Sequence, residues 1–196
     1  MSLRNWWERL LRPDFFSRRN IAASWLTGHG LEIGALHNPL RVPRCAHVTY
    51  VDRMSRADLI REFPELARRP IVDAKIIDKA ETLATVSDES QDFLIANHLI
   101  EHVENPIAAI ETFLRVLRPG GILYLAIPDM RSTFDVTRAE TSFAHLLRDY
   151  REGPACSQTD HFDDYALHVL KVSDPAQRAE SVAELIRANA NIHFHC

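Results

Sequence analysis

Apolar residues near the start of the chain follow helical spacing. Within 2–12 they recur three or four positions apart, with charged residues between them, and Pro13 follows. A second stretch of this kind covers 21–26, and Gly28 and Gly30 are expected to end the helix. We therefore expect two short helices before residue 30.

From residue 31 the apolar residues instead form short continuous runs. The runs occupy 31–35, 48–51, 71–77, 93–96 and 122–127. Apolar residues on successive positions are typical of strands buried on both faces, as in a parallel sheet covered by helices. The pattern predicts an α/β fold with a Rossmann-like, doubly wound and mostly parallel sheet.

The clearest helix is expected from Asn105 to Leu117. Asn105 is placed to cap it, Pro106 suits its first turn, and the apolar positions form one stripe. The sequence Pro-Gly-Gly at 119–121 is expected to end the helix and turn the chain into the next strand. Between Ala35 and Val48 the chain is short and contains two prolines, so the first crossover helix is expected to be very short or absent.

The alternation of strands and helices stops after residue 130. The sequence predicts a helix at 141–150, a polar loop at 153–164, and a helix from Pro175 to about Ala188 that Asp174 caps. This region is expected to be a helical insertion or lid after the fifth strand. The expected organisation is an N-terminal helical extension at 1–29, an α/β core at 30–129 and the insertion with a C-terminal part at 130–196.

Composition and charge narrow the classes of protein. The 196 residues are 46% hydrophobic and 26% charged, with a net charge of −4, so the chain is expected to be globular and to have no general affinity for nucleic acid. Its three cysteines lie far apart in sequence, which favours neither a disulfide framework nor a thiolate metal site, and no metal is expected. With no apolar run of 18 residues and no signal sequence, we expect a cytoplasmic protein without a membrane segment.

Two acidic residues stand where strands of the predicted sheet end. Glu32 and Gly34 lie at the end of the first run, and Asp52 follows the second about 20 residues later. A carboxylate at such a position accepts hydrogen bonds from ribose hydroxyls. The G-x-G-x-x-G pattern that holds a pyrophosphate is missing, which favours a nucleoside cofactor without phosphate.

Four elements in this order resemble the class I S-adenosylmethionine-dependent methyltransferases. They are Leu-Glu-Ile-Gly at 31–34, the strand ending in Asp52, the stretch 92–103 and Arg-Val-Leu-Arg-Pro-Gly-Gly at 115–121. The resemblance covers roughly residues 30–130. It implies S-adenosylmethionine as cofactor and a small-molecule or saccharide acceptor. Within this class, the chain resembles in particular the bacterial methyltransferase-domain proteins linked to polysaccharide and glycosyl-transfer pathways.

The resemblance assigns roles to individual residues of this chain. Glu32 and Gly34 match positions that contact the amino acid part of the cofactor, Asp52 matches the ribose-binding acid, and Asp78 matches the acid near the adenine amino group. Asn97 and His98 match positions beside the sulfonium. The neighbouring residues expected to join the cofactor site are Ala35 and Arg53. The first motif departs from the family pattern, because Leu36 and Asn38 stand where further glycines are common.

Histidine suits the removal of a proton from a hydroxyl acceptor near pH 7. His98 is the first candidate for this base and His102 the second. His145 and His161 are further candidates, from the expected insertion.

Two other functions fit parts of the sequence. The residues 98–102 spell H-x-x-E-H, the inverted zinc-protease signature, which requires one continuous helix. A non-catalytic binding module that keeps the methyltransferase fold is the other alternative.

The end of the chain bears on the sheet. Family members close the sheet with two further strands after the fifth, and 192–196 is too short to supply them. We therefore expect a truncated sheet that lacks these strands, with the fifth strand an open edge. A second copy of the chain or the insertion is expected to cover that edge.

Overall fold

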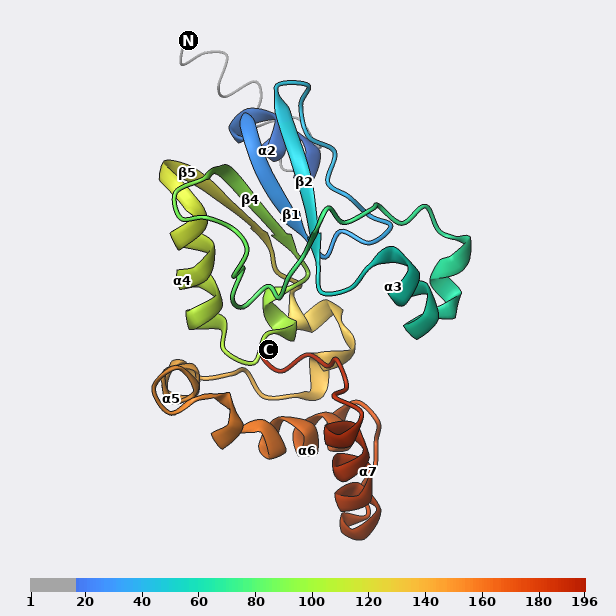
Figure 1. Cartoon of the computed structure of the whole chain (residues 1–196). Helices are drawn as coiled ribbons and strands as arrows, with labels where there is room; N and C mark the ends of the chain where they lie inside the picture. The colour runs from blue at the N-terminus through green and yellow to red at the C-terminus, as the bar shows by residue number, and fades with distance from the viewer. Residues whose placement is uncertain (1–16) are drawn as a thin grey trace. The chain divides into compact units, whose positions relative to one another are not determined.

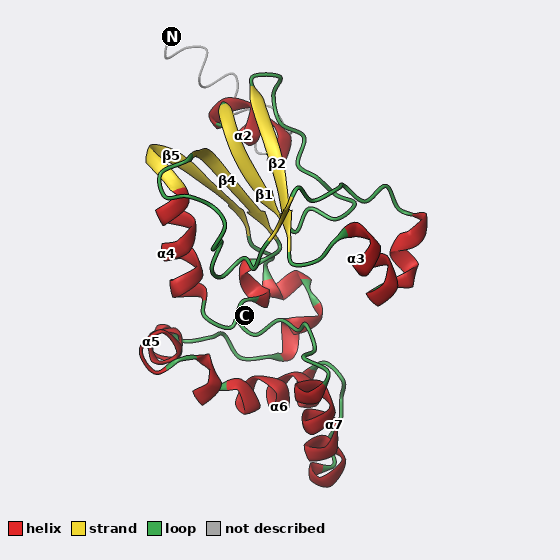
Figure 2. Cartoon of the chain, in the orientation of Figure 1, coloured by secondary structure: helices red, strands yellow, loops and turns green. Residues whose placement is uncertain are grey.

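A five-stranded sheet is the main feature of the computed structural model, which describes residues 17–196 (Figure 2). The strand order is β3-β2-β1-β4-β5, in which β1 is parallel to both β2 and β4, and β2 is parallel to β3. The strands are β1 (Gly28–Ile33), β2 (Ala46–Asp52), β3 (Ile76–Ile77), β4 (Gln91–Asn97) and β5 (Leu117–Ala126). This order contains the first five strands of the doubly wound arrangement expected from the sequence, on both sides of β1.

The edge strand β5 runs in the same direction as β4. The Ser90 N–H, just before β4, donates to the Val116 carbonyl just before β5 at 2.9 Å, and the His98 N–H, just after β4, donates to the Ala126 carbonyl at the end of β5 at 2.8 Å. The sheet is therefore parallel throughout. Because β5 has ten residues and β4 seven, the longer strand needs a local irregularity, and Gly120 adopts φ +82° within it.

The described residues divide into two compact units. One contains the described part of Met1–Ala96 together with Phe113–Tyr124, and the other contains Asn97–Thr112 and Leu125–Cys196. The helices, labelled in Figure 1, are α2 (Arg18–Trp25), α3 (Arg56–Glu62), α4 (Pro106–Val116), α5 (Phe143–Glu152), α6 (Gln158–His168) and α7 (Pro175–Arg187). Short 3-10 turns lie at Pro64–Arg68, Ile100–His102, Met130–Ser132, Phe134–Thr137 and Pro154–Cys156. The helix expected at 2–12 lies outside the described residues.

The core of the first unit consists of the apolar runs on which the strand prediction rested. Four consecutive residues of β4, 93–96, are at most 1% exposed, and Leu31 and Ile33 of β1 are 1% and 3% exposed. Phe93 and Ile95 pack in a cluster whose other buried members are Ala22, Leu26, Ala46 and Tyr124. Burial on both faces explains why these strands show continuous rather than alternating apolar residues.

Strand β1 begins earlier than the sequence predicted. A strand was expected at 31–35, after a helix ending at Gly28 and Gly30, but both glycines belong to β1 and the strand ends at Ile33. A Cβ built on Gly30 would lie 2.3 Å from the Phe93 carbonyl oxygen, so this glycine permits close contact with β4. The strand ends early because Gly34, at φ +64°, turns the chain.

The third strand is shorter than its apolar run. Only Ile76 and Ile77 form β3, although the run covers 71–77. Before them, Asp73 and Lys75 are exposed and form an ion pair with each other at 2.9 Å. The apolar run therefore overestimates the strand, because its middle faces solvent.

Helix α4 follows its prediction closely, whereas the segment after it does not. The Asn105 side chain accepts the Ala108 N–H at 3.1 Å, as a cap does, and the helix ends at Val116. The residues 119–121, expected as a turn, lie inside β5. No helix forms between β1 and β2, in agreement with the short, proline-containing connection.

The second unit packs α6 and α7 around the last residues of the chain. Phe162 and Ala166 of α6, Val182 of α7, and Ile192 and Phe194 form one buried cluster. The predicted loop at 153–164 is wrong: α6 begins at Gln158, because Phe162 and Ala166 are four residues apart and share a buried face. The Asp174 cap is confirmed, since its carboxylate accepts the N–H groups of Ala176 and Gln177.

Residues 192–196 have no regular secondary structure but are largely buried. Ile192, His193, Phe194 and His195 are each at most 9% exposed. These residues belong to the core of the second unit.

Among the described helices, none combines the length and the apolar character that crossing a membrane requires.

Candidate functional site

In the first unit, three strands bring predicted site residues to one edge of the sheet. Residue pairing aligns Ile33 with Val51, and Asp52 with Ile77, so β1, β2 and β3 end together. Glu32, Gly34 and Asp52 lie at these carboxyl ends, and Asp78 follows β3 directly. Ligands of open parallel sheets bind at this edge.

Glu32 is buried and holds the loop that follows β1. It is 1% exposed, and its Oε1 and Oε2 atoms lie 2.8 and 3.2 Å from the Leu40 backbone nitrogen, whose N–H they accept. A buried carboxylate requires such a donor. Glu32 therefore fixes the course of the segment 34–40 in addition to any contact with a ligand.

The turn after β1 adopts left-handed backbone angles twice. Gly34 has φ +64°, which glycine adopts readily, and Leu36 has φ +47°, which a branched side chain adopts rarely. Ala35 between them is buried. One residue further, the buried His37 Nδ1 has no hydrogen-bond partner. A strained turn with an unpaired polar atom is the kind of local arrangement found at ligand sites.

Asp52 ends β2 as a partly enclosed carboxylate. Its Oδ1 accepts the Met54 N–H at 3.3 Å. Burial raises the pKa of the Asp52 carboxyl above its usual value, against the lowering effect of nearby backbone donors and Arg53. Arg53 itself is exposed and pairs with Glu62 at 2.6 Å. Asp52 is thus suited to accept hydrogen bonds from a ligand, while Arg53 has a partner elsewhere.

Asp78 is occupied by the turn that follows β3. Its Oδ2 accepts both the N–H and the hydroxyl of Thr85 at 2.7 Å, and its Oδ1 accepts the Lys79 N–H at 2.8 Å. Burial acts to raise the pKa of Asp78, but these hydrogen bonds outweigh it and the pKa is lowered. Asp78 is at the expected place, and its hydrogen bonds shape the turn at 79–85.

This edge fits the nucleoside cofactor expected from the resemblance. The glycine turn gives backbone access, Asp52 supplies an acceptor, and the unpaired His37 Nδ1 supplies a further polar atom. A pyrophosphate cradle is missing from this turn. The residues present therefore suit a cofactor bound through its ribose and amino acid part.

In the second unit, the end of β4 carries two more predicted site residues. The buried Asn97 Oδ1 has no hydrogen-bond partner. His98 follows with φ +49°, and its side chain is 56% exposed. A histidine in the left-handed region, directly after a buried strand, places a basic nitrogen where solvent and ligands reach it.

Glu101 lies beside His98 and is the least satisfied side chain near β4. It is 4% exposed, and neither of its carboxylate oxygens has a hydrogen-bond partner. The His98 Nδ1 lies 3.6 Å from Glu101 Oε1, which is ion-pair distance once the imidazole is protonated. This carboxylate is therefore placed to stabilise a proton on His98.

His102 is less suited than His98 to act as a base. Its Nδ1 lies 2.9 Å from the Ile192 carbonyl, and its ring is 4.5 Å from that of His193, edge to face. Burial lowers the pKa of His102, and the neighbouring His193 lowers it further. His102 is thus held as a neutral, oriented side chain within the unit.

The zinc-protease interpretation of 98–102 is wrong. It requires His98 and His102 on one continuous helix, but His98 has left-handed angles and only Ile100–His102 forms a single 3-10 turn. The two rings therefore do not share a helix face.

Two groups of metal-ligating side chains lie in the second unit. One contains Glu101, His102 and His193, and the other contains His145, Asp149, His161 and His195. His145 and His161 were expected as candidate bases, whereas Asp149, His193 and His195 were not expected from the sequence. The spacings H-x-x-x-D at 145–149 and H-x-H at 193–195 are the signals that would have found them.

Comparison with known proteins adds a family and a set of relatives. The family described as "Methyltransferase domain" matches residues 28–125. A ubiquinone biosynthesis O-methyltransferase of Xanthomonas campestris pv. campestris (strain B100) is 26% identical over 118 residues, which cover 58% of this chain and 47% of that protein. The protein of the same name in Xanthomonas oryzae pv. oryzae (strain PXO99A) is 27% identical over the same shares. The chain thus spans about half the length of these relatives.

Solved structures give a weaker likeness. An S-adenosylmethionine-dependent methyltransferase from Aquifex aeolicus is 13% identical with a TM-score of 0.40, over 64% of this chain and 72% of that one. The [4+2]-cyclase SpnF is 21% identical with a TM-score of 0.43, over 87% and 74%. At these TM-scores the likeness supports no shared activity.

Proposed function

The chain belongs to the methyltransferase domain family, and from that membership we propose that it transfers a methyl group from S-adenosylmethionine to a hydroxyl group of a small molecule. The observation that carries the proposal is the sheet edge with Gly34 and Asp52, inside the matched range 28–125. Bound there, the sulfonium of the cofactor would supply an activated methyl group.

The first unit would bind the cofactor. Asp52 would accept hydrogen bonds from the ribose hydroxyls. The backbone at Gly34 would lie close to the amino acid part of the cofactor, with Ala35 alongside. Glu32 would act mainly by fixing the loop through Leu40. Asp78 would support the adenine side through the turn that it organises.

His98 would remove the proton from the acceptor hydroxyl. Methyl transfer requires the acceptor oxygen in line with the methyl group and, for a hydroxyl, a base to take its proton. The exposed His98 imidazole can take that proton, and the buried Glu101 carboxylate at 3.6 Å would stabilise the resulting imidazolium. Asn97 would offer its unpaired Oδ1 beside it.

The acceptor class is the finer part of the proposal. The relatives named as O-methyltransferases support a hydroxyl acceptor on a small molecule. A saccharide hydroxyl, which the narrower resemblance favours, is the second candidate.

Three further expectations from the sequence remain proposals. They are the cytoplasmic location, the domain boundaries at residues 30 and 130, and a second copy of the chain covering β5.

Calorimetry with S-adenosylmethionine and S-adenosylhomocysteine tests cofactor binding. We expect binding of both, and a loss of at least tenfold in affinity for Asp52→Ala, because the ribose hydroxyls lose a charged acceptor. Asp73→Ala is the control, since Asp73 is exposed and its carboxylate pairs with the neighbouring Lys75. Absence of binding at millimolar concentration would refute the enzyme proposal.

Release of S-adenosylhomocysteine from a panel of phenols and free monosaccharides tests turnover. We expect His98→Ala to keep its affinity for the cofactor and to lower kcat by roughly 10²–10⁴-fold, which is the usual contribution of a general base. The control is His29→Ala, an exposed histidine at the opposite end of β1. Equal turnover of His98→Ala and the unmodified chain would remove His98 from the mechanism.

The non-catalytic alternative makes a different prediction. A binding module would bind the cofactor, as in the first experiment, but release no S-adenosylhomocysteine with any acceptor class. The unusual first motif, with Leu36 at φ +47°, is the observation that keeps this alternative in consideration.

A further inference from the structure

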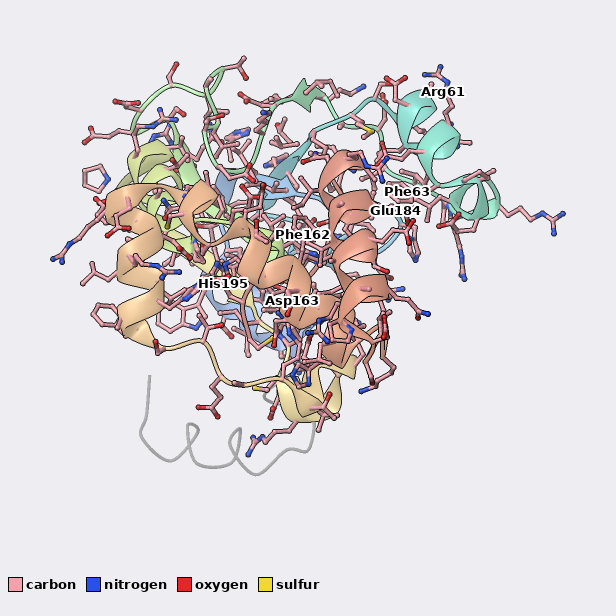
Figure 3. All side chains as sticks on the ribbon, turned by 90° about the horizontal axis from the view of Figure 1, so that it is seen from below. Arg61, Phe63, Phe162, Asp163, Glu184 and His195 are labelled. Atoms are coloured by element: carbon pink, nitrogen blue, oxygen red, sulfur yellow. The ribbon has the colours of Figure 1, made fainter. Side chains whose placement is uncertain are left out.

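Four side chains of the second unit converge on one buried point that the proposed methyl transfer does not use. His145 and Asp149 come from α5, His161 from α6 and His195 from the C-terminal segment. Their ligand atoms all lie within 4.8 Å of one another. Asp149 is fully buried, and His161 and His195 are 6% and 8% exposed. His195 lies beside α6, the helix that carries Phe162 and Asp163 (Figure 3).

The distances within this cluster are those of a coordination shell. The His145 Nε2 lies 3.1 Å from Asp149 Oδ2 and 3.2 Å from His161 Nε2, and His161 Nε2 lies 3.6 Å from the same Asp149 oxygen. Zinc–ligand bonds of 2.0–2.1 Å in a tetrahedron separate neighbouring ligand atoms by about 3.3 Å. Three nitrogen or oxygen atoms thus stand at the separations that one central ion produces.

Two atoms of the cluster are buried without a hydrogen-bond partner. They are Asp149 Oδ2 and His195 Nδ1. A buried carboxylate oxygen is destabilising unless a cation, either a metal ion or a protonated imidazole, neutralises it. A single cation bound at the centre of the cluster would supply a partner for both atoms.

On Asp149 and His195, the second polar atom of the side chain is hydrogen-bonded, as is usual for ligands in metal sites. The Ser157 hydroxyl donates to Asp149 Oδ1 at 2.6 Å, which leaves Oδ2 for the centre. The His195 Nε2 lies 3.2 Å from the Glu104 carbonyl, which leaves Nδ1 for the centre. Outer hydrogen bonds of this type fix the orientation and tautomer of metal-binding histidines.

The sequence places the four ligands by simple means. His145 and Asp149 are four residues apart, so they share one face of α5, which Ser142 caps. The C-terminal segment is fixed by backbone bonds: the Phe194 N–H donates to the Glu101 carbonyl, and Thr141 N–H donates to the Cys196 carbonyl, both at 2.8 Å. The segment therefore presents His195 in a defined position.

We propose that His145, Asp149, His161 and His195 bind one divalent transition-metal ion, of which zinc is the type, in a closed tetrahedral site. Three imidazole nitrogens favour zinc and similar ions over magnesium or calcium, which prefer oxygen. Because protein ligands fill all four positions, the ion is structural and joins α5, α6 and the C-terminal segment.

The test measures metal content and affinity on the full chain. The protein is stripped with a chelator and titrated with Zn²⁺ alone in the presence of a competing chromophoric chelator. We expect one zinc per chain, and an affinity loss of at least 100-fold for His161→Ala and for Asp149→Ala. The matched control is His168→Ala, a histidine on α6 that pairs with Asp164 outside the cluster, and it should keep full affinity.

Two further measurements make the outcome decisive. His102→Ala tests the neighbouring group of Glu101, His102 and His193: if this variant loses the zinc and His161→Ala keeps it, the proposed site is wrong. Co²⁺ added to the unmodified chain should give the intense visible spectrum of tetrahedral coordination, which needs no variant to fold. Less than 0.1 equivalent of zinc together with no cobalt spectrum would mean a hydrogen-bonded histidine network without metal, and would overturn the proposal.

Discussion

At the scale of single residues, Leu36 is unusual because it adopts an angle that glycine adopts more easily. Its φ of +47° lies two residues after Gly34 at +64°. The left-handed region costs a residue with a Cβ about 1 kcal/mol relative to glycine. The class of enzyme that the chain resembles commonly has glycine near this position, so the turn keeps its course with a less suitable residue.

Leu36→Gly and Leu36→Ala make a matched pair that measures this strain. Both remove the leucine side chain, but only alanine keeps the Cβ. We expect the glycine variant to have the higher free energy of unfolding, by about 1 kcal/mol, the reverse of the order at ordinary sites. Urea unfolding checks it, and an equal or higher stability for the alanine variant would contradict it.

The site residues divide into those that local sequence reveals and those that only the fold reveals. Asp52 ends β2 and His98 directly follows β4, so the apolar runs place them without further knowledge. The bond from Leu40 to Glu32 and the approach of His195 to His161 depend on tertiary packing. Spacing along the chain can mark single residues as candidates, but it does not show which distant segments meet.

At the scale of elements, Gly30 shows how closely β1 and β4 approach. A Cβ there would lie 2.3 Å from a backbone oxygen of Phe93, which cannot move aside as a side chain could. Gly120, by contrast, has nothing within 4 Å of its built Cβ but has φ +82°.

Alanine substitutions at these two glycines should therefore differ in effect. We expect Gly30→Ala to lower the free energy of unfolding by roughly 3 kcal/mol or more, because the ladder between β1 and β4 must shift. Gly120→Ala should cost about 1 kcal/mol from backbone strain alone. Chemical denaturation of both variants checks the order, and a smaller loss for Gly30→Ala would contradict the close approach.

Elements were predictable where their burial is simple. Strands enclosed on both faces gave continuous apolar runs, and α4 and α7 begin with Asn105 and Asp174 as side-chain caps. Helix α6 was missed because polar residues surround Phe162 and its buried neighbour His161 looks polar in sequence. The run at 71–77 misled in the opposite direction, since Asp73 and Lys75 face solvent.

At the scale of the whole molecule, the described residues form two compact units, and each unit contains segments that are separated in sequence. The second unit takes the end of β4 and most of α4 in addition to the residues after 125. Contacts between distant segments define this division, and no shift in composition marks it.

Metal removal should affect one unit alone. We expect chelation to speed hydrogen exchange in α5, α6 and 192–196, because the ion would join these three segments. Amides of β1 and β4 hold no cluster ligand and should keep their exchange rates. Hydrogen exchange with mass spectrometry checks this, and uniform loss of protection would contradict a local role of the metal.

The closeness of His193 and His195 in the C-terminal segment has a thermodynamic consequence. His193 bonds to Asp135 at 2.7 Å and contacts His102, whereas His195 belongs to the proposed zinc site, and only Phe194 separates them. A ligand that moved both His193 and His195 would therefore change the affinity of the proposed zinc site. By reciprocity, the factor by which such a ligand changes zinc affinity equals the factor by which zinc changes the affinity of that ligand.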